Sequence, residues 1–263
     1  MDIISLKGFS SNFRSLSFLL VVLFLSSCAP KAPPRISAPE EQSKKVLEDF
    51  ALALKSLQKI QSARGYAKLK LKVKGRSANV DEAVLIQLPR SFRFETVDDF
   101  GGPRFLLLSD GESLFWRDFS RKEEGREDLS EAALKKYLPM AADLSETLGL
   151  FMGRIPRDDV ATAKVSQEEG SGLYWILTPR SESLWDHEAR TILSFASKGE
   201  DGKVAYQYKA GEFQGLIPRR IFLKDLKTNN EVTIHYLDFQ LNPAIPRERF
   251  EVESSMKRSN DVD

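Results

Sequence analysis

The sequence predicts a mainly β protein of the α+β class, in which a curved antiparallel sheet forms an incomplete barrel lidded by about three helices. Stretches that alternate apolar and polar residues recur along the chain with turn residues between them, and Phe is frequent at 17 residues, which favours strands. An open sheet of about ten or eleven strands tends to curl. Because so few helices cannot cover both faces, we expect the sheet to curve around an apolar cavity.

Length and charge exclude several classes of protein. The 263 residues include 39 Lys plus Arg and 38 Asp plus Glu, so bulk charge gives no reason to expect a nucleic-acid partner. The expected organisation is a signal peptide (1–27), a tether (28–44), one domain (45–252) and a polar, disordered tail (253–263). We expect a monomer.

The N-terminal segment has the pattern of a secretory signal. Lys7 and Arg14 precede an apolar run, and small residues follow at Leu25-Ser26-Ser27-Cys28. The apolar run is shorter than the roughly 20 residues that a membrane span needs. The last four residues resemble a bacterial lipobox, which implies that the Cys28 thiol is acylated and that cleavage occurs just before it.

The segment after Cys28 is rich in proline and poor in apolar residues, with Pro30, Pro33, Pro34 and Pro39. It is typical of an extended tether. At about 3.1 Å per residue it could hold the domain up to roughly 50 Å from a bilayer.

The domain is expected to begin with a helix and an antiparallel meander. Apolar residues between Val46 and Ile60 have helical spacing, with Ser43 as a possible cap. Residues 67–74 then alternate apolar residues with lysines, which predicts a strand with one solvated face. Further strands are expected at 79–88 and 92–97.

A turn is expected at residues 98–103, because Gly101 and Gly102 are conformationally permissive and Pro103 cannot pair in a ladder. Phe100 would therefore lie at a loop tip. The alternative is that Phe100 folds back under the turn and packs against the adjacent strands. Strands at 105–109 and 114–119 follow, joined by a turn at Asp110-Gly111.

Two helices are expected in the middle of the chain. Asp128 with Glu131 resembles a capping box, and the apolar stripe that follows ends at Pro139. A second helix is expected from Asp143 to Met152, before Gly153. The remaining strands are expected at residues 160–165, 173–178, 191–197, 204–209, 219–224 and 232–241.

The order of these motifs resembles the LolA/LolB lipoprotein carrier superfamily and, within it, the LolB-like outer-membrane lipoprotein receptors. The resemblance covers most of residues 45–252. It rests on the lipobox, the helix before the lysine-alternating strand, and three further motifs: Phe92-Arg93-Phe94 followed by Asp98 and Phe100-Gly101, the run 215–221, and Asn242 to Phe250.

The resemblance implies a receptor, anchored by acyl chains on Cys28 and without other cofactors, that faces the periplasm from the outer membrane. It would accept lipoproteins from a periplasmic LolA-like carrier, bind their acyl chains and help insert them into the bilayer. Ala29 permits export to the outer membrane. Phe100 and Gly101 match the family's protruding loop, although Asp99 replaces its proline.

We expect the cavity to be lined from one face of the strands and from the helical lid. The sequence does not determine which face points inward. The candidate lining residues are Leu69, Leu71, Phe92, Phe94, Leu114, Trp116, Leu148 and Phe151.

Two alternatives to this receptor belong to other classes of function. The first is a scaffold or partner-binding module in the envelope, with the same fold and a solidly packed interior. The second is a lipid-active hydrolase, but His187 and His235 are the only histidines and no catalytic or metal-binding motif is present. Asp186-His187-Glu188 is interpreted as a polar turn, so we expect neither an enzyme nor a metal site.

Overall fold

The structure, a computed structural model, describes residues 34–138 and 142–252. The chain divides into two units, Met1–Pro34 and Arg35–Asp263, and the description below concerns the second. Cys28, the signal peptide, residues 29–33 of the expected tether and the C-terminal tail lie outside the described residues. Residues 34–44 of that tether are described, and they contain a short strand, Arg35–Ser37, and the start of a helix at Glu40. Among the helices that the structure describes, none combines the length and apolar character needed to cross a membrane.

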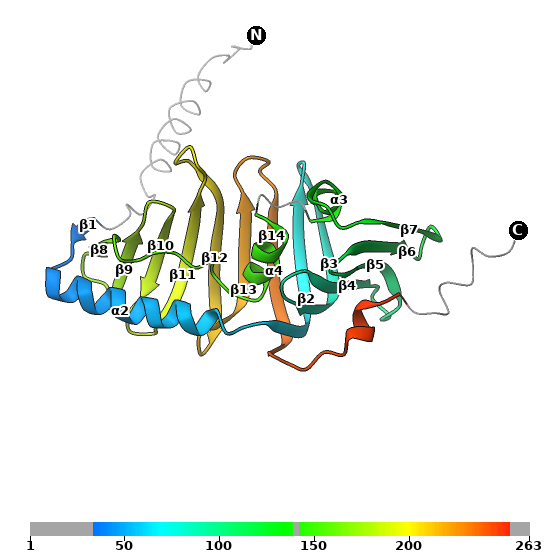
Figure 1. The fold of residues 1–263 in the computed structure, drawn as a ribbon, viewed down its shortest axis with the longest axis horizontal. Coiled ribbons are helices and arrows are strands. Elements are labelled where there is room, and N and C mark those ends of the chain that lie inside the picture. The colour runs from blue at the N-terminus through cyan, green and yellow to red at the C-terminus, as the bar shows by residue number, and fades with distance from the viewer. Residues whose placement is uncertain (1–33, 139–141, 253–263) are drawn as a thin grey trace, which may run out of the picture. The chain divides into compact units, whose positions relative to one another are not determined.

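The described residues form one antiparallel sheet of 14 strands, which is curved and unclosed (Figure 1). The strands are β1 (Arg35–Ser37), β2 (Ser62–Val73), β3 (Arg76–Gln87), β4 (Ser91–Val97), β5 (Pro103–Asp110), β6 (Ser113–Asp118), β7 (Glu123–Asp128), β8 (Lys164–Glu168), β9 (Leu173–Leu177), β10 (Ser181–Asp186), β11 (Thr191–Lys198), β12 (Val204–Gln214), β13 (Ile217–Asp225) and β14 (Glu231–Leu241). The helices are α2 (Glu40–Leu57), α3 (Glu131–Tyr137), α4 (Leu144–Phe151) and the 3-10 helix η1 (Arg247–Phe250).

The strand order is β1-β8-β9-β10-β11-β12-β13-β14-β2-β3-β4-β5-β6-β7. Most neighbours are consecutive in sequence, so most of the sheet is a meander of hairpins. The exception at the centre is the pairing of β14 with β2, in which Ile234 lies opposite Leu69. The middle of the sheet is therefore built from the two ends of the domain.

Three helices lie on the concave face, where the main core forms. In Figure 1, α2 crosses the half of the sheet that contains β8 to β12. Phe50 of α2 packs edge-on against Trp185 of β10, with ring centroids 5.6 Å apart. At the centre, the Tyr236 hydroxyl donates to the Phe151 carbonyl of α4 at 2.8 Å, and the Tyr206 hydroxyl donates to the Glu146 carboxylate.

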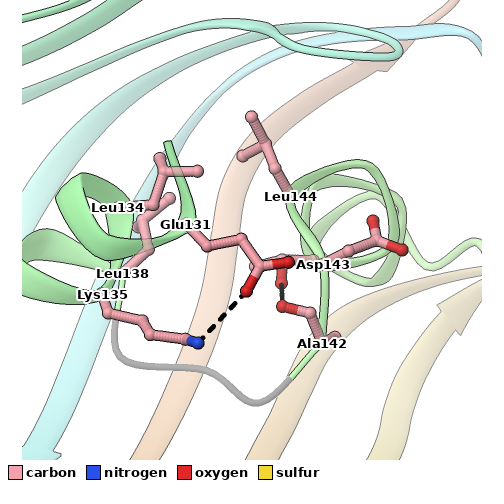
Figure 2. Close-up of a pocket in the computed structure, with 8 residues that line it drawn as sticks. Glu131, Leu134, Lys135, Leu138, Ala142, Asp143 and Leu144 are labelled. Atoms are coloured by element: carbon pink, nitrogen blue, oxygen red, sulfur yellow. Dashed lines mark hydrogen bonds and ion pairs between the residues drawn. The ribbon is translucent and has the colours of Figure 1, made fainter. Parts of the chain in front are cut away.

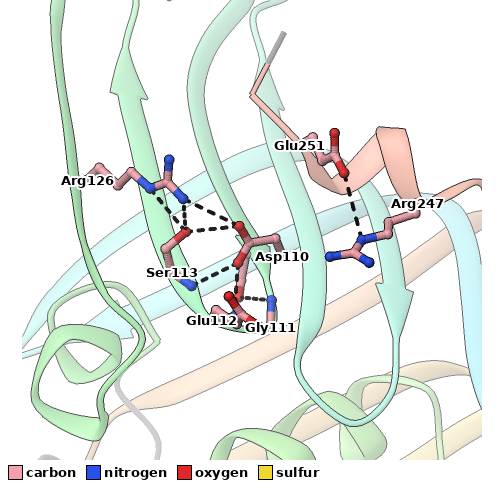
Figure 3. Close-up of polar contacts among 8 residues, drawn as sticks. Asp110, Gly111, Glu112, Ser113, Arg126, Arg247 and Glu251 are labelled. Atoms are coloured by element: carbon pink, nitrogen blue, oxygen red, sulfur yellow. Dashed lines mark hydrogen bonds and ion pairs between the residues drawn. The ribbon is translucent and has the colours of Figure 1, made fainter.

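A smaller core lies on the opposite face of β5 and β6. Leu106, Leu108 and Phe115 are buried there, with Val252 packed against them. Figure 3 shows the polar rim of this region, where Arg126 donates to the Ser113 hydroxyl at 2.8 Å and lies 3.6 Å from the Asp110 carboxylate. These contacts join β7 to the turn between β5 and β6.

The predicted fold class is confirmed, with three α-helices in the described part of the chain. The predicted start of the first helix was wrong. α2 begins at Glu40, and Ser43 lies inside it with its hydroxyl donating to the Ala38 carbonyl. Acidic residues in the first turn suit the helix dipole, and they precede the apolar pattern on which the prediction relied.

The predicted cap of α3 was also wrong. Ser130 caps it by accepting from the Ala133 amide at 3.2 Å, whereas Asp128 ends β7. The helix expected from Asp143 to Met152 is α4, and the Asp143 carboxylate caps it by accepting from the Glu146 amide at 2.8 Å.

The predicted strand count was too low. The edge strands β1 and β7 were missed because they lack an apolar alternation, which an exposed edge does not require. β10 was missed because two of its inward positions are serines, Ser181 and Ser183, beside the buried Trp185. The strand expected at 160–165 is β8 at Lys164–Glu168.

Candidate functional site

The concave face holds an apolar cavity of ≈ 310 Å³ that is partly open to solvent. It lies between the strands β14, β2, β3, β4 and β5 and the short helices α3 and α4. Its size is at the lower end of the range of roughly 300 to 1,000 Å³ for small-molecule sites. It is lined by Leu69, Leu71, Val73, Val80, Glu82, Val84, Phe94, Thr96, Phe105, Leu107, Lys136, Tyr137, Leu138, Phe151, Val232, Ile234 and Tyr236.

The cavity exists because the helices cover the two halves of the sheet unequally. α2 has 18 residues and buries five of them on its half. α3 and α4 have only 7 and 8 residues, which is too short to fill the space above five strands. Phe151 of α4 approaches Phe94 of β4, with ring centroids 6.0 Å apart, and closes one side.

The structure brings together four of the residues predicted to line the cavity, namely Leu69, Leu71, Phe94 and Phe151. Phe92, Leu114 and Leu148 share the same inward side but are fully buried in the core, where they do not border the cavity. Trp116 is half-buried beside β7, where its indole leaves no room for a Cβ on Gly125. The inward face is thus the one opposite the lysines of β2.

Sequence reasoning missed Glu82, which is the only carboxylate among the described residues that line the cavity. The registers place it in a row across the sheet, between Ala67 of β2 and Thr96 of β4. It is buried, with 6% of its surface exposed. The Thr96 hydroxyl donates to its Oε2 atom at 2.8 Å. The alternation with Val80 and Val84 was the available signal, since it places Glu82 on an apolar face.

Burial raises the pKa of Glu82 to about 7, because a low-dielectric environment disfavours the charged form. The hydrogen bond from Thr96 lowers this pKa, and the nearby carboxylate of Glu95 raises it. At neutral pH the carboxyl is therefore distributed between its acid and its ionised form.

The loop with Phe100 extends from the end of β4. Asp98 organises it, since its Oδ1 atom accepts from the Phe100 amide at 2.9 Å and from the Gly102 amide at 2.8 Å. Gly101 has a φ of 81°, which suits glycine. Phe100 is 99% exposed, so its ring does not pack under the turn.

A smaller hollow of ≈ 40 Å³ separates α3 from α4. Figure 2 shows the ion pair between Glu131 and Lys135 at its edge, beside Leu134 and Asp143. This hollow is much smaller than the apolar cavity of ≈ 310 Å³, and the apolar cavity is the candidate site for an acyl ligand.

The polar side chains in the part of the chain that the structure describes offer no metal site. No group of three His, Cys, Asp or Glu residues there could hold a metal ion. Asp186 accepts from the Ala189 amide at 2.9 Å, as in a polar turn. His187 stands edge-on to the Tyr174 ring, and its Nδ1 atom is 3.7 Å from the Asp49 carboxylate.

The sequence matches no protein-family model and no curated protein. Its fold is similar to that of a domain from Vibrio parahaemolyticus assigned as an outer membrane lipoprotein-sorting protein, with 9% identity over 80% of this chain and 97% of that chain and a TM-score of 0.47. A DUF1329 family protein from Desulfovibrio piger has 10% identity over 79% and 96% of the two chains, with a TM-score of 0.47. A LolA superfamily protein from Nitrosomonas europaea has 14% identity over 80% and 97%, with a TM-score of 0.45.

Glu82→Gln should stabilise the protein at alkaline pH. The folded-state pKa of Glu82 is raised above its ordinary value of 4.5 to about 7. Burying the ionised form therefore costs stability progressively as the pH rises from about 4.5 to about 7. The neutral amide escapes this cost, so we expect a gain of roughly 3 kcal/mol near pH 8 that shrinks toward zero near pH 4.5.

Urea unfolding of both proteins at several pH values measures the difference. Glu231→Gln is the matched control. Glu231 lies on the outer face, where its hydrogen bond with Lys224 lowers the pKa of Glu231, and its loss should not stabilise the protein at alkaline pH. A gain from Glu82→Gln that is the same at every pH would contradict the prediction.

Proposed function

We propose that this protein is a membrane-anchored receptor that binds acyl chains, accepts lipoproteins from a periplasmic carrier and helps insert them into the outer membrane. The apolar cavity of ≈ 310 Å³ on the concave face carries the proposal. A scaffold that uses the same fold needs no such cavity, and an unfilled apolar cavity costs stability. The sequence resemblance to the LolB-like receptors supplies the identity of the ligand and of the donor.

The size of the cavity suits reversible binding. Burying a chain of about 16 carbons completely would contribute on the order of 13 kcal/mol, at about 0.8 kcal/mol for each methylene. A receptor must gain less than the bilayer offers, because the chain must leave for the membrane. A small and partly open cavity buries only part of such a chain.

Phe100 suits the transfer step. Its loop joins the ends of β4 and β5, and each of these strands contributes a cavity residue near that end, Thr96 and Phe105. An exposed aromatic ring on a turn held by Asp98 can contact a bilayer surface or an incoming chain.

Acyl binding in the cavity can be tested on the purified domain. The purified domain should retain acyl lipid that is detected by organic extraction and mass spectrometry, and Leu71→Trp should lose it because the larger ring fills the cavity. Lys70→Trp is the matched control, since it adds the same ring to the exposed face of the same strand. Absence of lipid from the parent domain, or equal retention by both variants, would refute acyl-chain binding in this cavity.

The role of the exposed ring in transfer can be tested with Phe100→Glu. Because the side chain is 99% exposed, the free energy of unfolding should change by no more than about 0.5 kcal/mol. Lipoprotein transfer to vesicles should nevertheless be lost. Phe100→Leu should retain transfer. Leu52→Glu is the control for adding a charge at an exposed apolar position, since Leu52 is 61% exposed on α2, and it should also retain transfer. A fully active Phe100→Glu protein would exclude a role for this loop.

The proposed lipid anchor can be tested by replacing Cys28. Acylation of Cys28 would attach the protein to the outer membrane by two or more chains, as stable anchoring requires. Cys28→Ser should therefore release the protein from the membrane fraction. Density-gradient separation of the two membranes is the measurement. Recovery of the parent protein in the inner membrane, or of the variant still attached, would overturn this localisation.

A further inference from the structure

We propose that Glu82 recognises the carbonyl of an ester or amide in the bound ligand, so that the cavity prefers acyl chains in ester or amide linkage to plain hydrocarbon. This inference rests on the proposed function, because it assumes that the cavity binds an acyl ligand. It adds a polar contact, and a ligand class, to a site that is otherwise defined by its apolar lining.

The position of Glu82 in the sheet supports this assignment. Its row contains Tyr236, Ala67, Thr96 and Phe105, which lie opposite one another in neighbouring strands. On one side of the row the cavity is lined by Leu69, Leu71, Val73 and Val80, and on the other by Val84, Phe94 and Leu107. A ligand that places one polar group against Glu82 must therefore have apolar parts on both sides of it, as an internal ester or amide does.

Glu82 also has hydrogen-bonding capacity to spare. Thr96 is the only partner of its carboxyl among the described residues. Two other polar groups of the lining are already engaged, since the Tyr236 hydroxyl donates to the Phe151 carbonyl and the Lys136 ammonium donates to Glu127. An acid in this position retains an O–H that can donate to a carbonyl oxygen.

The surroundings favour the acid form in the complex. Lys136 and Tyr137 of α3 and Tyr236 of β14 border the same cavity, and the charge of Lys136 is paired with Glu127. Glu95 on the neighbouring strand raises the pKa of Glu82. An apolar ligand that displaces water from the cavity disfavours the ionised carboxyl further.

The test compares two probes of equal size, hexyl hexanoate and tetradecane. Each is titrated against the domain loaded with the fluorescent reporter N-phenylnaphthylamine, and the ratio of the two affinities is measured near pH 6 and near pH 9. One neutral hydrogen bond is worth about fivefold in affinity. Tetradecane gains more than the ester on leaving water, so the ratio of ester to alkane affinity is compared between conditions. In the parent protein this ratio should be about fivefold higher near pH 6 than near pH 9, because the ionised carboxylate cannot donate.

Two variants separate hydrogen bonding from other effects. Glu82→Gln keeps an N–H donor at every pH, so its ratio of ester to alkane affinity should be the same under both conditions. Glu82→Leu removes the donor, so its ratio should not depend on pH and should lie about fivefold below that of the parent protein near pH 6. Glu231→Gln, on the outer face, should behave like the parent protein.

The possible failures are distinguishable. If the ratio of ester to alkane affinity does not fall between pH 6 and pH 9 in the parent protein, or if it is the same near pH 6 in the parent protein and in Glu82→Leu, the role of Glu82 is overturned while acyl binding stands. If neither probe displaces the reporter from the parent protein, the proposed function itself fails. Should Glu82→Leu not fold, the other two proteins decide the question. The ratio of ester to alkane affinity should fall between pH 6 and pH 9 in the parent protein and should stay constant in Glu82→Gln.

Discussion

The central constraint on this fold is that the apolar concave face of the sheet is larger than the helices can cover. A sheet of 14 antiparallel strands must shield one face from water, because the hydrophobic contribution scales with the apolar area removed from it. Curvature shields part of that face, and α2 shields another part. Above β14 and β2 to β5, only α3 and α4 remain, and the deficit there is the cavity.

The pairing of β14 with β2 makes the cavity a property of the whole domain. Val232 and Ile234 come from the end of the domain and face Leu71 and Leu69 from its beginning. The cavity floor therefore requires both halves of the sheet to be formed. This arrangement fixes the inward face of each strand, since a shift of one residue would reverse every side chain.

Glu82 is the exception to the apolar interior of this cavity. Its burial opposes ionisation, and the single hydrogen bond from Thr96 compensates only in part. A carboxyl held in a cavity at a stability cost is a reasonable candidate for a functional group. Phe100 presents the opposite case, an apolar ring held in solvent by a turn that the Asp98 carboxylate and the φ of Gly101 keep in shape.

The sequence by itself determined the features that depend on local chemistry. Alternation indicated most of the strands, turn residues placed Phe100 at a tip, and the helix expected from Asp143 is α4. It could not identify β7 and β10, because edge exposure and inward serines remove the apolar pattern.

Only the tertiary structure decided which predicted residues border the cavity. Strand periodicity defines two faces but not which of them is covered, and it cannot separate a residue facing an open cavity from one packed under a helix. Phe94 and Phe92 alternate identically along β4, yet Phe94 lines the cavity and Phe92 lies in the solid core. Glu82 likewise could be recognised as a candidate site residue only in the tertiary structure. Part of its surroundings comes from β14 and α4, which are far from it in sequence and whose positions no local pattern encodes.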